Sequence, residues 1–166
     1  MTFRTISRML IQDMELKAEA SPRLRTHFNF HEHSDALVQR LLIQLRRGTY
    51  IRPHRHFELN KWEMTLVIAG EVEIVLFDDN GALRERIRVG AGGDTMGLEL
   101  PPEIWHSYVP LTTQATFFEI KQGPYDAARM SQFAPWSPAE GETQVAAYLD
   151  WMEHGALGSR FSGAPA

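Results

Sequence analysis

The chain has 166 residues, 43% of them hydrophobic and 23% charged, which is the composition of one globular domain and excludes a disordered or fibrous protein. The absence of cysteine excludes disulfides, thiolate metal sites and a catalytic thiol. The formal net charge of −4 argues against nucleic acid or an anionic membrane as the main partner. No signal peptide and no apolar run of membrane length is apparent, so we expect a cytoplasmic protein.

The chain begins with a charged segment that has no clear period. Residues 1–34 are therefore expected to form an arm, in which Ser21-Pro22 can start a turn or a short helix.

Trp62 lies on the apolar side of an alternating segment and is expected to pack in the core. Asp79-Asn80-Gly81 is a hairpin signal. Alternation of apolar and polar residues predicts strands at 37–46, 62–68, 71–77, 84–89 and 115–121. Short strands with frequent turns predict an all-β sandwich or barrel.

The pattern changes to a helical period near the C-terminus. The order Ser137-Pro138-Ala139-Glu140 is that of a capping box with proline at the first helical position, and Gly155 fits a helix stop. We expect one helix packed outside the β body, with Trp136 anchoring this segment. No linker divides the chain, which predicts one domain over residues 1–157. Its expected parts are a core at about 35–122, a C-terminal segment and helix at 123–157, and beyond the domain a flexible tail at 158–166.

Three of the seven histidines have the spacing of a metal site. His54 and His56 are two residues apart in an extended segment, so their side chains point to the same face. Glu63 follows at the start of the next strand, and His106 follows a proline turn. Imidazoles with a carboxylate suit a divalent first-row metal. The alternative is that His54 and His56 are solvated loop residues, as an isolated His-x-His more often is. No role is assigned to His27, His33 and His154.

Two stretches resemble the cupin motifs. The first is Gly48, His54-x-His56, Glu63 and Gly70, with six residues between His56 and Glu63 where the family usually has three or four. The second is a proline turn, Pro101-x-x-x-x-His106. Over residues 20–145 the chain resembles the WbuC-type cupin metalloproteins, named from bacterial O-antigen gene clusters. The blocks that carry this resemblance are SPRLRTHFNFHEHS, VQRLLIQL, PHRHF with KWE, FDDNG, WHSYVPL, FEIKQGPY and FAPWSPAEGE.

The resemblance implies a fold and a metal. The fold is a cupin-type double-stranded β-helix, or jelly roll, with the C-terminal helix outside it. The cofactor is one divalent transition metal, which the residues do not narrow beyond Fe, Mn, Ni, Co, Cu or Zn. Its implied ligands are His54, His56, Glu63 and His106. Glu63 can also be a neighbouring carboxylate that does not touch the metal.

Polar residues on otherwise apolar faces are candidates for a pocket beside the metal. Gln39 continues the face of Leu41, and Lys121 and Glu119 share the face of Phe117. Such side chains can also sit at strand ends and reach water. The charged segment before the first strand resembles a WbuC-type pattern and could fold over the barrel mouth to hold an anion. The candidate pocket residues are Arg23, Arg25, Asn29, His31, Gln39, Lys61, Trp105 and Lys121.

The leading hypothesis is a metal-dependent enzyme, an isomerase or epimerase, that acts on a sugar or sugar-nucleotide derivative of O-antigen metabolism. The metal would polarise a carbonyl or bind hydroxyls, and Glu63 or Lys121 could move a proton. The alternatives are an iron-dependent dioxygenase and a non-catalytic, metal-stabilised ligand-binding module. We expect a small-molecule ligand of anionic character, no nucleic acid or membrane partner, and a homodimer formed through exposed sheet edges.

Overall fold

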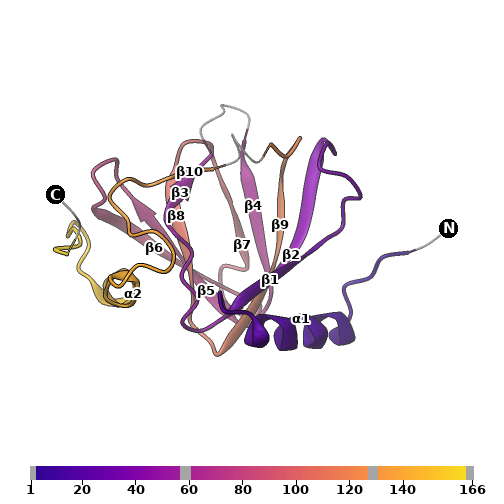
Figure 1. The fold of residues 1–166 in the computed structure, drawn as a ribbon. Coiled ribbons are helices and arrows are strands. Elements are labelled where there is room, and N and C mark those ends of the chain that lie inside the picture. The colour runs from indigo at the N-terminus through magenta and orange to yellow at the C-terminus, as the bar shows by residue number, and fades with distance from the viewer. Residues whose placement is uncertain (1–2, 57–60, 127–130, 164–166) are drawn as a thin grey trace.

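Two antiparallel five-stranded sheets face each other in the computed structural model, which describes residues 3–56, 61–126 and 131–163 (Figure 1). The first sheet has the order β1 (Arg25–Asn29), β2 (Val38–Arg46), β9 (Gln114–Gln122), β4 (Glu63–Ala69), β7 (Gly97–Leu100). The second has the order β10 (Gln132–Phe133), β3 (His54–Arg55), β8 (Trp105–Pro110), β5 (Glu71–Phe77), β6 (Leu83–Gly90).

The sheet orders are those of a jelly roll, because strands distant in sequence lie side by side. β9 lies between β2 and β4, and β8 lies between β3 and β5. The chain therefore crosses repeatedly between the two sheets. A buried cluster fills the space between them and includes Leu45, Val67, Ile74, Tyr108 and Phe117. The predicted fold class, all-β with a cupin-type double-stranded β-helix, is confirmed.

The burial of the β4 residues is the reverse of what their hydrophobicity predicts. Glu63, Thr65 and Val67 are buried, whereas Met64 and Leu66 are 37% and 40% exposed. Trp62, expected in the core, is only half-buried. The pattern fails here because the barrel interior is polar around the site, while the outer face of the first sheet carries apolar residues.

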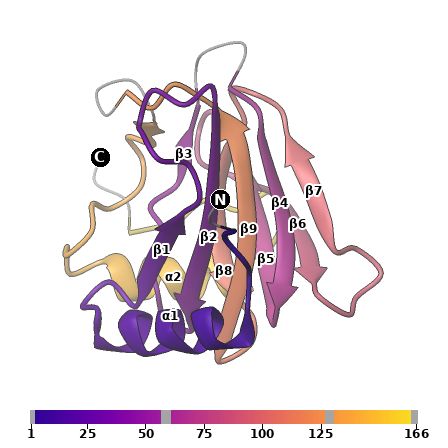
Figure 2. The same ribbon diagram turned by 90° about the vertical axis from the view of Figure 1, so that its right-hand side faces the viewer.

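A helix that the sequence analysis did not anticipate lies in the N-terminal arm. α1 (Arg8–Ala20) begins at Ser7, whose side chain accepts a hydrogen bond from the Leu10 amide. Its buried residues are Met14 and Ala18, and it packs against β1 and β2 (Figures 1 and 2). The arm therefore consists of a helix and an edge strand joined to the first sheet. Ser7 and the apolar spacing of Leu10, Met14 and Ala18 were the available signal.

The C-terminal helix packs outside the second sheet, as expected, but begins later than predicted. α2 (Val145–His154) starts seven residues after the expected Pro138 and ends at Gly155, whose amide donates to the Trp151 carbonyl. The capping-box prediction is wrong because Ser137 does not cap a helix. Its hydroxyl donates to the Ala134 carbonyl and accepts from Arg52. In the described part of the chain, no helix is long and apolar enough to cross a membrane.

Aromatic packing attaches the C-terminal segment to the β body. Trp136 lies 5.1 Å from Phe77 and 5.8 Å from Trp105, ring centre to ring centre, which confirms the anchoring role expected of it. Gly81 in the β5–β6 hairpin has φ +80°, and a Cβ there would lie 2.6 Å from the Trp136 ring. In the expected tail, Phe161 packs 5.0 Å from Tyr148. The described part of that tail therefore contacts the body.

A carboxylate from the C-terminal segment joins two arginines of the N-terminal arm. Arg23 donates to both oxygens of Glu140 at 2.7 Å, and Arg25 also donates to one of them. Arg25 further donates to the Tyr50 carbonyl at 2.9 Å. These guanidinium groups were expected to hold an anionic ligand. In the structure both donate hydrogen bonds to Glu140, and the ligand-binding role remains a prediction. They tie β1 to the segment before α2.

Replacing this carboxylate is expected to destabilise the fold in a pH-dependent way. Burial alone would raise the pKa of Glu140, but Arg23 and Arg25 outweigh it and hold the pKa below 4.5. A depressed carboxyl pKa adds stability above about pH 4.5, and this is lost as the pH falls through the folded-state value. Glu140→Gln should therefore cost about 1–2 kcal/mol at pH 7, allowing for solvent screening, and almost nothing in acid.

Urea unfolding at pH 7 and at pH 3.5 measures this difference. Glu142→Gln is the matched control, because Glu142 lies two residues away and is exposed. Equal losses for the two variants at pH 7 would contradict the assigned role of Glu140.

Candidate metal centre

Three histidines meet inside the barrel. His54 on β3 pairs in register with His106 on β8, and their ring centres are 4.4 Å apart. His56 follows β3 directly, with its ring 5.8 Å from that of His106. One nitrogen from each ring lies within 4.8 Å of the other two. The expected two-residue spacing of His54 and His56 thus brings both rings to the same place as the histidine after the proline turn.

Backbone carbonyls fix the tautomers of two of these rings. Nδ1 of His54 lies 3.0 Å from the Arg52 carbonyl, and Nδ1 of His106 lies 2.9 Å from the Ile104 carbonyl. A carbonyl can only accept, so each Nδ1 carries the proton and each Nε2 presents a lone pair. Nε2 of His106 is buried and has no hydrogen-bond partner among the residues that the structure describes. An unpaired buried acceptor is costly, and a metal ion at this point would satisfy it.

The electrostatics of the cluster favour metal-binding protonation states. Burial lowers the pKa of His54 well below 6.5 and also lowers the pKa of His106, so both imidazoles are neutral at pH 7. Burial would raise the pKa of Glu63, but the hydrogen bond with His56 and the charge of Lys121 hold it well below 4.5. Neutral imidazoles beside an ionised carboxylate are the donor set that a divalent transition metal requires.

Glu63 lies against this cluster from the opposite sheet. Its Oε2 is 2.9 Å from Nε2 of His56, and its Oε1 is 4.0 Å from Nε2 of His106. The Tyr108 hydroxyl donates to Oε1 at 2.6 Å. The carboxylate therefore reaches two of the three rings, and its role as fourth ligand remains a prediction.

A cavity of about 240 Å³, which we call the inner chamber, adjoins the cluster. His54 and Glu63 line it together with Glu119 and Lys121 of β9. The apolar part of its wall consists of Leu41, Ile43, Ile51 and Phe117. A small molecule in this space would lie against His54 of the cluster and against Glu63.

Glu119 and Lys121 form a buried ion pair in the inner chamber. Lys121 Nζ lies 2.6 Å from Glu119 Oε1, and the two side chains are 16% and 6% exposed, respectively. Burial, followed by the negative charge of Glu63, raises the pKa of Glu119 to about 7. Burial would lower the pKa of Lys121, but Glu119 and Glu63 raise it above 10.5. Lys121 is therefore charged at pH 7, and Glu119 is poised to take up or release a proton.

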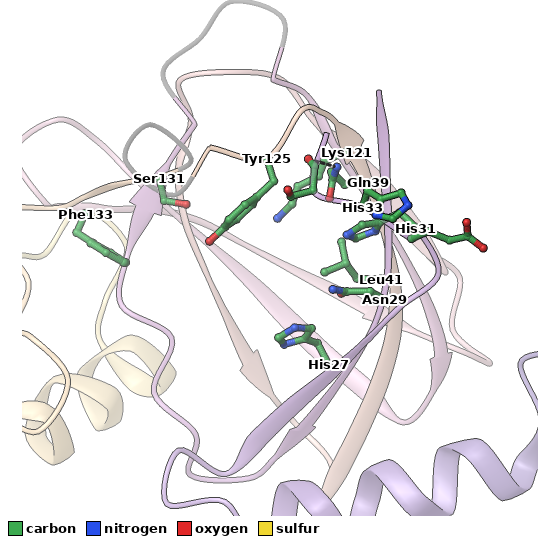
Figure 3. A pocket seen from close by; sticks show the side chains of 12 residues that line it. His27, Asn29, His31, His33, Gln39, Leu41, Lys121, Tyr125, Ser131 and Phe133 are labelled. Atoms are coloured by element: carbon green, nitrogen blue, oxygen red, sulfur yellow. Dashed lines mark hydrogen bonds between the residues drawn. The ribbon is translucent and has the colours of Figure 1, made fainter. Parts of the chain in front are cut away.

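A second cavity of about 590 Å³, which we call the outer chamber, shares His27, Leu41 and Lys121 with the inner one. In Figure 3, Asn29 and Leu41 lie between His27 and the Lys121–Gln39 group. The other residues that line it are His31, Glu32, His33, Ser34, Tyr125, Ser131 and Phe133.

The predicted pocket residues are distributed unequally over this site. Asn29, His31, Gln39 and Lys121 line the outer chamber, and Arg23 and Arg25 line the inner one. Of the described residues, Lys61 and Trp105 line neither. Trp105 belongs to the cluster under α2 and donates to Asp79, because it alternates with His106 and so faces outward. Lys61 donates to the carbonyls of Gln122 and Pro124.

Three residues of the site were missed or left without a role. His27 was assigned no function, although it shares a strand face with Asn29 and lies two residues before it. Tyr108 was not considered, although it is two residues after His106 and so shares its face. Tyr125 lines the outer chamber from a segment with no strand or helix period, and nothing in the sequence indicated it.

Comparison with known proteins shows a family without an assigned function and a widespread fold. A family model described as "Domain of unknown function (DUF6016)" matches residues 6–89. No curated protein sequence matches the chain.

Three solved structures illustrate the fold similarity. An oxalate oxidase in complex with the substrate analogue glycolate has 15% identity and a TM-score of 0.53, over 81% of this chain and 73% of that chain. Protein SO0799 from Shewanella oneidensis has 15% identity and a TM-score of 0.52, over 64% and 72%. A mutant of Bacillus subtilis oxalate decarboxylase has 17% identity and a TM-score of 0.51, over 68% and 28%. At these identities the likeness concerns the fold alone.

Proposed function

Because the chain belongs to the DUF6016 family, which is described only as a domain of unknown function, we propose its function from the site: a metal-dependent enzyme that moves a proton on a small polar molecule. The observation that carries the proposal is the buried Nε2 of His106, which has no hydrogen-bond partner in the described part of the chain and lies near ring nitrogens of His54 and His56. These three residues would hold the metal, with Glu63 as the fourth ligand. A bound metal would supply Lewis acidity at an oxygen of the substrate.

The proton-transfer part of the proposal rests on Glu119. It is buried in the inner chamber, is not one of the candidate ligands, and has a pKa of about 7, which suits a group that both accepts and returns a proton at neutral pH. Lys121 would orient Glu119 and hold negative charge on the substrate.

We propose a sugar or sugar-nucleotide derivative as substrate class, supported by the resemblance of the sequence blocks to WbuC-type proteins of O-antigen clusters. We further propose a cytoplasmic location and a homodimer, the dimer because each sheet is open and ends in edge strands that can pair with a second copy. Size-exclusion chromatography with light scattering tests the dimer.

Solvent-hydrogen exchange tests the proposed function directly. Metal-loaded protein is incubated in D₂O with aldoses, ketoses and their nucleotide derivatives, and NMR follows deuterium entering carbon positions next to a carbonyl. The proposal expects exchange that is lost on chelation and reduced about 100-fold or more in Glu119→Gln. Unchanged exchange in Glu119→Gln would contradict the assigned base, and oxygen consumption without exchange would favour a dioxygenase.

Metal removal is expected to lower stability without unfolding the chain. The two core clusters contain none of the three candidate histidines, so the β body should persist without metal. A metal bound only to the folded state adds about 2.7 kcal/mol at a hundredfold excess over its dissociation constant, equivalent to about 5–10 °C in Tm. Circular dichroism with and without a chelator measures both effects. Loss of the β signal at room temperature would show instead that the site is structural.

A further inference from the structure

The two chambers form one binding site with unlike halves. They share His27, Leu41 and Lys121, so a molecule lying against these residues can extend into both. The inner half is lined by His54 of the histidine cluster, and the outer half is the larger. The charges of the inner chamber and the hydrogen-bonding groups of the outer chamber indicate which kind of ligand the site binds.

Basic and acidic side chains are equal in number in and beside the inner chamber. Arg23, Arg25 and Lys121 line it with Glu63 and Glu119, and Glu140 is bound to the two arginines. Three basic side chains thus meet three acidic ones in and beside this chamber. A divalent ion held by the histidines would therefore leave positive charge uncompensated in this space. An anionic group of the ligand compensates this charge.

The outer chamber offers neutral groups that both donate and accept hydrogen bonds. Figure 3 shows His27 and Asn29 pointing from β1 into this space, and neither side chain has a hydrogen bond within the described residues. Nδ1 of His31 lies 3.0 Å from the amide nitrogen and 3.1 Å from the carbonyl oxygen of Arg40, which leaves Nε2 available to a ligand. Glu32, the acidic residue of the lining, is paired with Arg4 at 3.1 Å. Hydroxyl groups, which also donate and accept, match this lining.

We infer that the ligand is a sugar acid: a hydroxy-carboxylic acid whose carboxylate end lies in the inner chamber beside the three histidines and whose polyhydroxyl chain lies in the outer chamber against His27 and Asn29. The inference rests on the proposed metal site and narrows its substrate class. It also assigns His27 and Asn29 a role in selecting ligands by length.

Three probes separate the two halves of the inference. Glycolate carries only the carboxylate end, glucose only the hydroxyls, and gluconate both. Each is titrated into cobalt(II)-loaded protein, with the visible cobalt spectrum and calorimetry as readouts. Gluconate should bind about 100-fold more tightly than glycolate, as two or three added hydrogen bonds allow, and glucose should be weakest.

Substitutions in the outer chamber test which residues cause the difference in affinity between gluconate and glycolate. His27→Ala and Asn29→Ala should each weaken gluconate about tenfold and leave glycolate and the cobalt content unchanged. Asn80→Ala is the matched control, since Asn80 is an exposed amide in the β5–β6 turn. Gluconate binding no tighter than glycolate, glucose binding as tightly as gluconate, or equal losses for glycolate and gluconate in the variants would each overturn the inference. No effect of either acid on cobalt-loaded protein would also overturn it. Failure to bind cobalt would instead remove the proposed function on which the inference rests.

Discussion

Replacing His54 and His56 together with alanine should abolish stoichiometric metal binding. The two rings supply two of the three nitrogens that lie within 4.8 Å of one another, and His106 with Glu63 alone cannot replace them. Changes to groups that merely orient metal ligands commonly weaken affinity 10- to 100-fold, so the loss of two ligands should exceed about 100-fold. Metal analysis of protein purified without a histidine tag gives the metal content per chain.

Two further variants show whether the loss of metal is specific to the histidine cluster. The double variant His33→Ala/His154→Ala removes the same number of imidazoles outside the cluster and should keep the full metal content. His106→Ala should reduce binding as the double variant does, while leaving the β-sheet circular dichroism unchanged. Full metal retention after loss of both His54 and His56 would place the metal elsewhere in the chain.

The fold could be predicted from the sequence because its strands alternate and are punctuated by turns. Asp79-Asn80-Gly81 lies between β5 and β6 as the hairpin signal indicated. The start of α2 could not be predicted, because the Ser137 hydroxyl and the Glu140 carboxylate have the residue types of a capping box but serve tertiary contacts. Local propensity cannot distinguish a cap from a side chain bound elsewhere in the fold.

The metal cluster could be predicted from a local pattern, whereas the pocket could not. His54 and His56 needed only the two-residue period of a strand, which is local. The pocket required knowing which polar faces turn inward, and β4 shows why this fails: Glu63 and Thr65 face the interior while Met64 and Leu66 are partly exposed. Where function places polar groups inside a barrel, the hydrophobic pattern points to the wrong side.

The ion pair of the inner chamber provides the largest expected effect on stability. Lys121→Met should lower the free energy of unfolding by about 3–5 kcal/mol at pH 8, because it leaves the Glu119 carboxylate buried without its counter-charge. Replacing both partners by apolar residues, in Lys121→Met/Glu119→Leu, should restore most of this stability, since a buried pair adds little over well-packed hydrophobic side chains. Lys17→Met is the matched control. Lys17 pairs with Asp13 at 2.7 Å on the exposed face of α1, and its loss should cost less than about 0.5 kcal/mol.

The pH dependence distinguishes this effect from a simple loss of packing. The pKa of Glu119 is raised from 4.5 to about 7, so the folded protein binds this proton more tightly than the unfolded chain, and the contribution of Glu119 to stability falls as the pH rises through that interval. Lys121 lowers this pKa, so its removal raises it further and extends the fall to higher pH. The difference between Lys121→Met and the unchanged protein should therefore be largest above pH 7 and should shrink toward pH 5, where Glu119 is protonated. Urea unfolding between pH 5 and pH 8.5 measures it, and a loss that stays constant over this range would mean that Lys121 acts through its hydrocarbon chain and not through its charge.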